Sequence, residues 1–326
     1  MITIKEALTK KEMKDYVMFS FELYKNNPYW IPPIIAEELE TFDKTKNPAL
    51  QTAEAHFYLA YKDNKIVGKI AAIINWEEVN LLGKRKARFG WFDAIDDIEV
   101  TKALLDKVEE LGRKHNMDHM EGPMGFSNLD KVGILSEGFD QMGNMITWYS
   151  LPYYITHFEQ LGFIKEKEYI ESDFSFNGIN PEPFQKASEL IKKRYELRSL
   201  NFTKTKDIMP YVDKMFDLFN ETYARLQSFV PINNIQKEYF KKKYIGFINP
   251  EFIKFIVDKN DNMIAFAIVM PGFAQALKKA NGKLFPFGFY HLLQARKHSK
   301  EVVFYLIGIT PEYQSKGVTA IVFDEY

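Results

Sequence analysis

The chain has 326 residues, a formal net charge of −1, and a hydrophobic fraction of 46%. This length and apolar content can supply two ordinary cores, and the charge balance gives no reason to expect a nucleic acid or a membrane as partner. The chain has no cysteine, which excludes disulfides, thiolate metal sites and cysteine nucleophiles. No apolar run has the length of a signal peptide or a membrane span, so we expect a cytoplasmic protein.

The first half of the chain has the patterns of a mixed α/β domain. Residues 10–24 show helical spacing of apolar side chains. Residues 56–75 contain two apolar runs joined by a polar turn, which is the pattern of a β-hairpin. A further strand is expected at residues 87–92, followed by a helix whose N-cap is Asp96 or Asp97.

Residues 177–183 (NGINPEP) are the best candidate for an interdomain linker. One glycine and two prolines there interrupt both the helical and the strand periodicity. We therefore expect one domain over residues 1–177 and a second over residues 184–326.

The two halves also resemble each other. Each runs from a helix through a proline-containing break and a hairpin to a strand, a turn and a helix. Tyr24 and Pro32 are eight residues apart, as are Tyr223 and Pro231. Repetition on this scale predicts a domain duplication.

The stretch TPEYQSKGVTA (residues 310–320) carries the strongest chemical signal. It follows an apolar run at residues 301–309 and leads into AIVFDEY, which has the pattern of a helix start. A strand, a short turn and a helix direct backbone N–H groups and a helix N-terminus toward an anion.

This stretch resembles the acyl-CoA turn of the GCN5-related N-acetyltransferase (GNAT) superfamily, whose pattern is Gln/Arg-x-x-Gly-x-Gly/Ala. Thr319 stands where that pattern has Gly or Ala, which adds bulk where the backbone should approach phosphate. The resemblance implies acetyl-CoA, or another acyl-CoA, as cofactor, with its pyrophosphate on the amides of the turn and its thioester carbonyl on the preceding strand. The residues so implied are Ile307, Gly308, Ile309, Gln314, Ser315, Lys316, Gly317, Val318 and Thr319.

Nearly the full length is similar to tandem acetyltransferase-like proteins of unknown substrate. The similarity rests on GKIAAIIN, MEGPMGFSNLDKVGILSEGFD, WYSLPYY and MPGFAQALKKANGKLFPFGF. It implies two tandem acyl-CoA N-acyltransferase-like domains, each a mainly antiparallel mixed α/β sheet flanked by helices. A domain of this kind normally continues well beyond the acyl-CoA turn, so we expect the second domain to be C-terminally incomplete.

The function implied by the resemblance is transfer of acetyl from acetyl-CoA to the amine of a small molecule or peptide. The superfamily often uses a Glu or a water as base near the motif strand and a Tyr later in the domain as acid. Glu301 and Tyr305 are the only candidates that we place on that strand, and the later Tyr would lie beyond residue 326. Two alternatives remain open: a non-catalytic binding or structural protein on a decayed fold, and an aminoacyl or peptidyl transferase.

The first domain is expected to have lost the cofactor site and to serve acceptor binding or scaffolding. Where the second copy has Gln, Lys and Gly, the first has Asp93, Asp96, Asp97 and Glu99 and no glycine. These carboxylates suit a helix N-terminus but would occupy the amides that a pyrophosphate needs and would repel it. The alternative is that the copies are misaligned and that a glycine turn lies at residues 122–125.

A glycine-rich loop at residues 122–144 either lines a substrate pocket or is a polar surface loop. On the pocket hypothesis, Asn128 and Asp130 in the loop and Tyr149 and Tyr153 after it are the candidates, although these aromatic residues also suit a core. Residues 285–298 form either a lid or packing between domains. The remaining signals are weak: His115 and His119 lack a third ligand nearby, so no metal site is expected.

Overall fold

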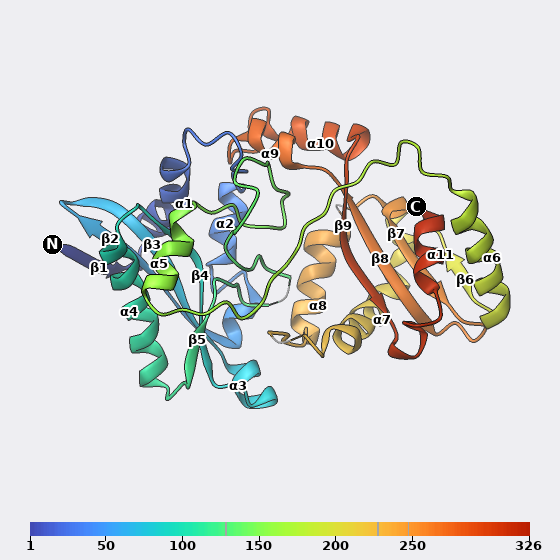
Figure 1. The fold of residues 1–326 in the computed structure, drawn as a ribbon, viewed down its shortest axis with the longest axis horizontal. Helices are drawn as coiled ribbons and strands as arrows, with labels where there is room; N and C mark the ends of the chain where they lie inside the picture. Colours follow the sequence, from blue (N-terminus) through green and yellow to red (C-terminus); the bar gives the residue numbers. More distant parts are fainter. Residues whose placement is uncertain (128, 227, 247) are drawn as a thin grey trace. The chain divides into compact units, whose positions relative to one another are not determined.

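The structure is a computed structural model that describes residues 1–127, 129–226, 228–246 and 248–326. The chain divides into two compact units (Figure 1). The first unit combines Met1–Ile164 with Gly272–Ser299, and the second combines Lys165–Pro271 with Lys300–Tyr326.

The first unit is built on a five-stranded sheet in the order β1-β2-β3-β4-β5. Neighbouring strands are antiparallel except β4 and β5, which are parallel. The strands are β1 (Ile2–Glu6), β2 (Ala53–Lys62), β3 (Lys65–Asn75), β4 (Lys86–Ala94) and β5 (His119–Glu121). The helices are α1 (Lys10–Leu23), α2 (Ile35–Thr41), α3 (Trp76–Leu82), α4 (Ile98–Lys114), α5 (Tyr153–Gln160), α9 (Ala274–Ala280) and α10 (Gly288–His298), with a 3-10 turn η1 (Pro48–Gln51).

Local chemistry explains why these elements form where they do. Thr9 and Glu12 form a capping box at the start of α1. Asp63 and Asn64 connect β2 to β3 with φ of 51° and 61°, the left-handed geometry that a two-residue hairpin turn requires. The predicted hairpin is confirmed.

A β-bulge interrupts β4 in the middle of the sheet. Lys69 pairs with Asp93 and Ala71 pairs with Gly90, so Trp91 and Phe92 lie opposite a single residue of β3. Trp91 has a φ of 46°, which is costly for a bulky side chain and is held by burial in the core.

The second unit has a four-stranded antiparallel sheet in the order β6-β7-β8-β9. The strands are β6 (Arg198–Leu200), β7 (Ile253–Val257), β8 (Met263–Pro271) and β9 (Val302–Ile309). The helices are α6 (Glu182–Tyr195), α7 (Thr205–Tyr223), α8 (Asn234–Phe240) and α11 (Val318–Glu325), and the shorter turns are η2 (Lys241–Ile245), η3 (Pro250–Phe252) and η4 (Pro311–Tyr313). α11 and α6 pack on β7 and β8 through Val318, Ile321, Val322, Ile256, Ile264 and Ile191.

The strand before the acyl-CoA-like turn is interrupted as well. Ile268 pairs with Leu306 and Val269 with Phe304, which leaves Tyr305 as the extra residue of a bulge in β9. Gly308 is required nearby, because a Cβ atom there would lie 2.3 Å from the Phe266 ring and 2.9 Å from the Thr222 hydroxyl of α7. β9 and α7 can therefore approach closely.

The observed units differ from the predicted domains in two ways. The boundary lies at Ile164 and Lys165, and residues 163–181 contain neither helix nor strand. The segment Gly272–Ser299 joins the first unit, although it connects β8 to β9 of the second. Sequence order placed this segment in 184–326, but its buried contacts are with α1 and α2. Among the described residues, no helix is long and apolar enough to cross a membrane.

Candidate functional site

The turn after β9 has the strand–turn–helix geometry expected from the sequence. β9 ends at Ile309, η4 and a four-residue turn follow, and α11 begins at Val318. Gly317 is the N-cap of α11 with φ of 77°, a conformation that glycine adopts without strain. A Cβ at Gly317 would also lie 2.9 Å from the Ile191 side chain of α6.

The N-terminus of α11 presents free donors. Of the described backbone hydrogen bonds around the turn, Tyr313 donates to Thr310 and Lys316 to Tyr313, and none is donated by the N–H groups of Gly317, Val318 or Thr319. No side chain caps this helix. These three N–H groups can therefore donate hydrogen bonds to an anion, and the helix dipole favours its negative charge.

Other polar groups of the turn already have partners. The Lys316 ammonium lies 2.9 Å from a Glu312 carboxylate oxygen, which raises the Lys316 pKa, and 4.2 Å from the centre of the Tyr313 ring. The Gln314 amide donates to the carbonyl of Ile309 at 3.0 Å. Gln314 thus secures the turn to the end of β9.

The outer edge of β9 is open along the described chain, since only β8 pairs with this strand. Thr310 donates its N–H to Ile264 of the neighbouring chain segment. In an antiparallel strand, the N–H groups of successive residues point alternately to its two edges. Since the Thr310 N–H points to β8, the N–H groups of Ile307 and Ile309 point to the open edge. These two donors are placed to polarise a carbonyl.

Tyr223, the last residue of α7, reaches the same edge. Its hydroxyl donates to the Ile307 carbonyl at 3.1 Å. Burial raises the pKa of Tyr223, so the phenol stays protonated at neutral pH. The sequence interpretation did not select this residue for the site.

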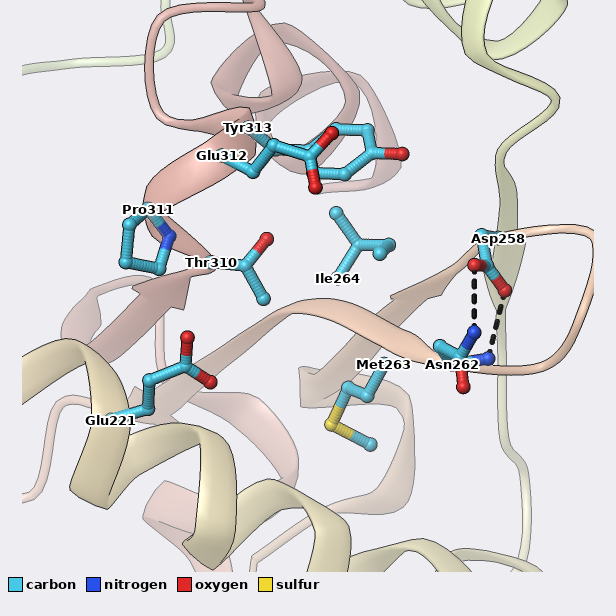
Figure 2. Close-up of a pocket in the computed structure, with 9 residues that line it drawn as sticks. All are labelled: Glu221, Asp258, Asn262, Met263, Ile264, Thr310, Pro311, Glu312 and Tyr313. Carbon is cyan, nitrogen blue, oxygen red and sulfur yellow. Dashed lines mark hydrogen bonds between the residues drawn. The ribbon is translucent and has the colours of Figure 1, made fainter.

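A pocket of about 480 Å³ opens where β9 meets its turn. Figure 2 shows Thr310 at its centre, the Glu221 carboxylate of α7 below, and Asp258 hydrogen-bonded to Asn262 at one side. Glu312 also lines it. Because Glu312 is paired with Lys316, the negative charge of the pocket comes from Glu221 and Asp258, and it favours a cationic amine.

The predicted catalytic candidates lie further from the turn. Glu301 immediately precedes β9, and Ile307 follows six residues later, roughly 20 Å along an extended strand. Tyr305 is the bulge residue of β9, two positions before Ile307. Of the two, only Tyr305 lies near the open N–H groups of the strand.

The corresponding turn in the first unit is shorter, and a side chain already caps the helix that follows it. Only residues 95–97 separate β4 from α4. Asp97 is the N-cap of α4, and its carboxylate accepts from the Glu99 N–H at 3.1 Å. It also accepts from the Lys62 ammonium at 2.8 Å, and this hydrogen bond is the main cause of the lowered pKa of Asp97. An anion at this helix N-terminus would have to displace the Asp97 carboxylate.

Asp93 has a different role from the capping expected for it. It is buried on β4 and accepts from Ser20 at 2.6 Å, Tyr24 at 2.8 Å and Tyr154 at 3.2 Å. Asp96 lies 3.2 Å from the His157 ring. Of the two expected N-cap residues, Asp97 caps α4 and Asp96 does not. Asp93 lies too early to reach the helix, because β4 continues through Ala94.

Tyr24 and Tyr223 occupy equivalent places. Tyr24 closes α1 and bonds to Asp93 of β4, while Tyr223 closes α7 and bonds to Ile307 of β9. The equal Tyr–Pro spacing was the sequence signal for this correspondence. That spacing indicated a repeat, but it did not indicate that the Tyr24 hydroxyl reaches β4 or that the Tyr223 hydroxyl reaches β9.

The predicted pocket residues belong to the first unit and bond within it. Asp130 accepts from the Ser127 N–H at 2.9 Å, Tyr149 donates to the Phe139 carbonyl at 2.8 Å, and Tyr153 donates to the Ala94 carbonyl at 2.7 Å. Asn128 lies outside the described residues. Asp130 and Tyr149 therefore stabilise the loop that holds them, and Tyr153 links the start of α5 to the end of β4.

The histidines show no metal-binding arrangement among the described residues, where no group of three or more potential ligands is close enough. The His115 ring at the end of α4 lies 2.9 Å from a Glu54 carboxylate oxygen, and His119 is on β5.

The comparisons with known proteins place this geometry in context. No protein-family model matches the chain. Protein YghO of Escherichia coli (strain K12) is 27% identical over 326 residues, which cover 98% of this chain and 81% of that protein. The bacterial ceramide synthase of Caulobacter vibrioides (strain NA1000 / CB15N) is 24% identical over 312 residues, which cover 94% of this chain and 80% of that protein.

Among solved structures, a tandem GNAT protein from the clavulanic acid biosynthesis pathway superposes with a TM-score of 0.50 at 10% identity, covering 99% of this chain and 83% of that one. At this identity the likeness concerns the fold alone. The chain has a tandem fold of the GCN5-related N-acetyltransferase type, which confirms the predicted fold class.

Proposed function

We propose that this protein is an N-acyltransferase that takes the acyl group from an acyl-CoA bound at its second unit. The observation that carries the proposal is a pair of adjacent donor sets. The free amides of Gly317, Val318 and Thr319 suit a pyrophosphate, and the outward N–H groups of Ile307 and Ile309 suit a thioester carbonyl.

The residues of the turn fit this donor, with two departures. Gly317 has the left-handed backbone and lacks the Cβ that would crowd Ile191. Thr319 adds a side chain beside the amides, and the charge of Lys316 is partly balanced by Glu312. We expect binding through the backbone more than through Lys316.

Two residues of α7 are assigned roles in the transfer. Glu221 accepts a proton from the acceptor amine, whose nitrogen forms a bond to the acyl carbon as the carbon–sulfur bond breaks. Tyr223 donates its hydroxyl proton to the departing sulfur and is reprotonated from solvent. The backbone N–H groups of Ile307 and Ile309 stabilise the charge on the carbonyl oxygen.

The acceptor is proposed to be a primary amine. The carboxylates of Glu221 and Asp258 attract an ammonium group, which first loses one proton to solvent. Glu221 then takes the second proton as the neutral amine attacks the acyl carbon. The similarity to a ceramide synthase favours a second, narrower candidate: a ceramide is the N-acyl derivative of a long-chain amino alcohol, so the acceptor would be such an alcohol and the donor a fatty acyl-CoA.

Calorimetry with CoA tests the donor site. We compare the wild type with Gly317→Val and with a matched control, Gly83→Val, which changes another left-handed glycine with no neighbouring atoms around its Cβ position. CoA should bind the wild type and Gly83→Val but not Gly317→Val. Equal affinity in all three proteins would refute the site.

Thiol release with a panel of amines tests the reaction. Because the chain has no cysteine, a thiol reagent reports only free CoA. Acetyl-CoA and palmitoyl-CoA are each offered with short diamines, a peptide amine and a long-chain amino alcohol. CoA binding without thiol release from any combination would instead favour the non-catalytic alternative, and transfer only from charged tRNA would favour the aminoacyl transferase.

A further inference from the structure

The connection between β8 and β9 has an unusual composition. Gly272–Ser299 contains five lysines and arginines and no aspartate or glutamate. The whole chain has a net charge of −1, so the excess of positive side chains in this segment is a local feature and not a property of the chain. The segment forms a helical hairpin of α9 and α10, seen in orange in Figure 1. We call it the basic hairpin.

The basic hairpin is held in the first unit through α9 and its turn. Phe273, Ala276 and Ala280 are buried. The Gly282 carbonyl accepts from the Ile35 N–H of α2 at 2.9 Å, and a Cβ at Gly282 would clash with the Phe21 ring of α1. At its base, the Ser299 hydroxyl donates to the Gly272 carbonyl at 3.3 Å. These contacts fix one side of the hairpin.

The other side exposes large apolar groups. Phe285 is 78% exposed and Phe287 71% exposed. Phe289, Tyr290 and Leu293 continue this surface along α10, where Gly288 is the only residue buried. Scattered exposed apolar residues are ordinary, but five within nine residues form a patch that water solvates poorly.

Cations flank the patch. Lys279, Lys283 and Lys297 are exposed and make no ion pair within the described part of the chain. With no carboxylate in the segment, their charges add. Aromatic and leucine side chains beside several lysines match the chemistry of the membrane interface, where rings enter the headgroup region and cations meet lipid phosphates.

We propose that the basic hairpin binds the surface of an anionic phospholipid bilayer, with Phe285 and Phe287 inserted at the boundary between headgroups and acyl chains. The expectation of no membrane partner rested on the charge of the whole chain. That average hides a segment in which every charged residue is positive.

Vesicle flotation measures the binding. Vesicles of phosphatidylcholine with 30% phosphatidylglycerol are compared with pure phosphatidylcholine, at low and high salt. We expect binding only to the anionic vesicles, at least tenfold weaker in high salt because surface charges are screened. Phe285→Ser/Phe287→Ser and Lys283→Glu/Lys297→Glu should each reduce the bound fraction at least tenfold.

Two controls change the same chemistry elsewhere in the first unit. Leu81→Ser removes a 68% exposed side chain from α3, and Lys10→Glu/Lys11→Glu reverses two exposed charges of α1. Both should bind as the wild type does. If they lose binding as strongly as the hairpin variants, or if the wild type does not bind anionic vesicles, the proposal is overturned.

The absence of cysteine permits a local readout. Phe287→Cys and Lys10→Cys are each labelled with an environment-sensitive fluorophore, and anionic vesicles should shift the emission to the blue only at position 287. Two results would assign the surface to another partner and overturn the proposal. One is a lipid-free dimer that Phe285→Ser/Phe287→Ser converts to monomer, and the other is a position-287 shift with single-stranded RNA but not with vesicles.

Discussion

The Lys69 ammonium lies 3.6 Å from a carboxylate oxygen of Asp93, and both side chains are buried in the first unit. Asp93 also accepts from three hydroxyl groups, and the Lys69 ammonium also lies over the face of the Tyr16 ring, 5.0 Å from its centre. Asp93 is thus the centre of a buried polar cluster that joins α1, β3, β4 and α5.

Asp93→Ala should lower the free energy of unfolding of the first unit by about 3–5 kcal/mol, because it leaves a buried ammonium group without a counter-charge. Lys69→Met should cost less, since Asp93 keeps its three hydroxyl donors. Asp106→Ala, which removes an exposed ion pair with Lys102, should change the free energy by at most about 0.5 kcal/mol.

Urea denaturation followed by tryptophan fluorescence measures these changes. All four tryptophans, at positions 30, 76, 91 and 148, lie in the first unit, so the signal reports that unit alone. A cost for Asp93→Ala equal to that of Asp106→Ala would contradict the prediction.

Tyr223→Phe tests the proposed proton donor. We expect kcat for acyl transfer to fall about 100-fold or more, with little change in stability, because the phenol leaves only a backbone carbonyl behind. The equivalent change in the first unit, Tyr24→Phe, should leave turnover unaffected and cost about 1–3 kcal/mol, because Asp93 loses a buried donor. Equal turnover in Tyr223→Phe and the wild type would remove Tyr223 from the mechanism.

Thr319→Gly should strengthen CoA binding by about three- to tenfold, since it removes a side chain beside the free amides of α11 without changing its charge. Thr205→Gly, in the first turn of α7 in the same unit, is the control and should bind CoA as the wild type does. Calorimetry at one salt concentration measures both. Weaker binding by Thr319→Gly would show that the hydroxyl contacts the ligand.

Glu325 makes the second unit sensitive to acid. Burial raises the pKa of its carboxyl, but hydrogen bonds from Lys192 at 2.7 Å and Asn201 at 2.8 Å outweigh burial and lower the pKa from 4.5 to about 2. A folded-state pKa below the unfolded value stabilises the fold above about pH 4.5, and this contribution is lost as the pH falls toward 2.

Glu325→Gln should therefore lower the stability of the second unit at pH 7 by roughly 1–3 kcal/mol and flatten its decline between pH 4.5 and 2. Amide hydrogen exchange of residues 253–271 measures this, and the tryptophan transition of the first unit should not move. An unchanged acid profile would contradict the assignment.

Trypsin should cut first at Lys165 or Lys167, in the exposed stretch without helix or strand. We expect the two fragments to elute together under native conditions, because the basic hairpin lies on the C-terminal fragment and packs on α1 and α2. Gly282→Val should weaken that packing and let the fragments separate. Separation of the wild-type fragments would show that the hairpin does not hold them.

The sequence by itself determined the local elements and the acyl-CoA-like turn. Positions 63–64 specify a hairpin because Asp and Asn tolerate left-handed backbone, Asp97 caps α4 because its carboxylate bonds a free N–H, and Gly317 marks the turn because only glycine adopts its backbone without strain. Each of these features depends on residues within a few positions of one another.

The tertiary structure decided which distant residues meet. Tyr223 reaches Ile307 across 84 positions and Tyr24 reaches Asp93 across 69, and no spacing in the sequence fixes such a pair. The basic hairpin joins the first unit although its neighbours in sequence belong to the second, because buried contacts with Phe21 and Ile35 outweigh chain order. Periodicity records which face of an element is apolar, and only packing selects the surface against which that face is buried.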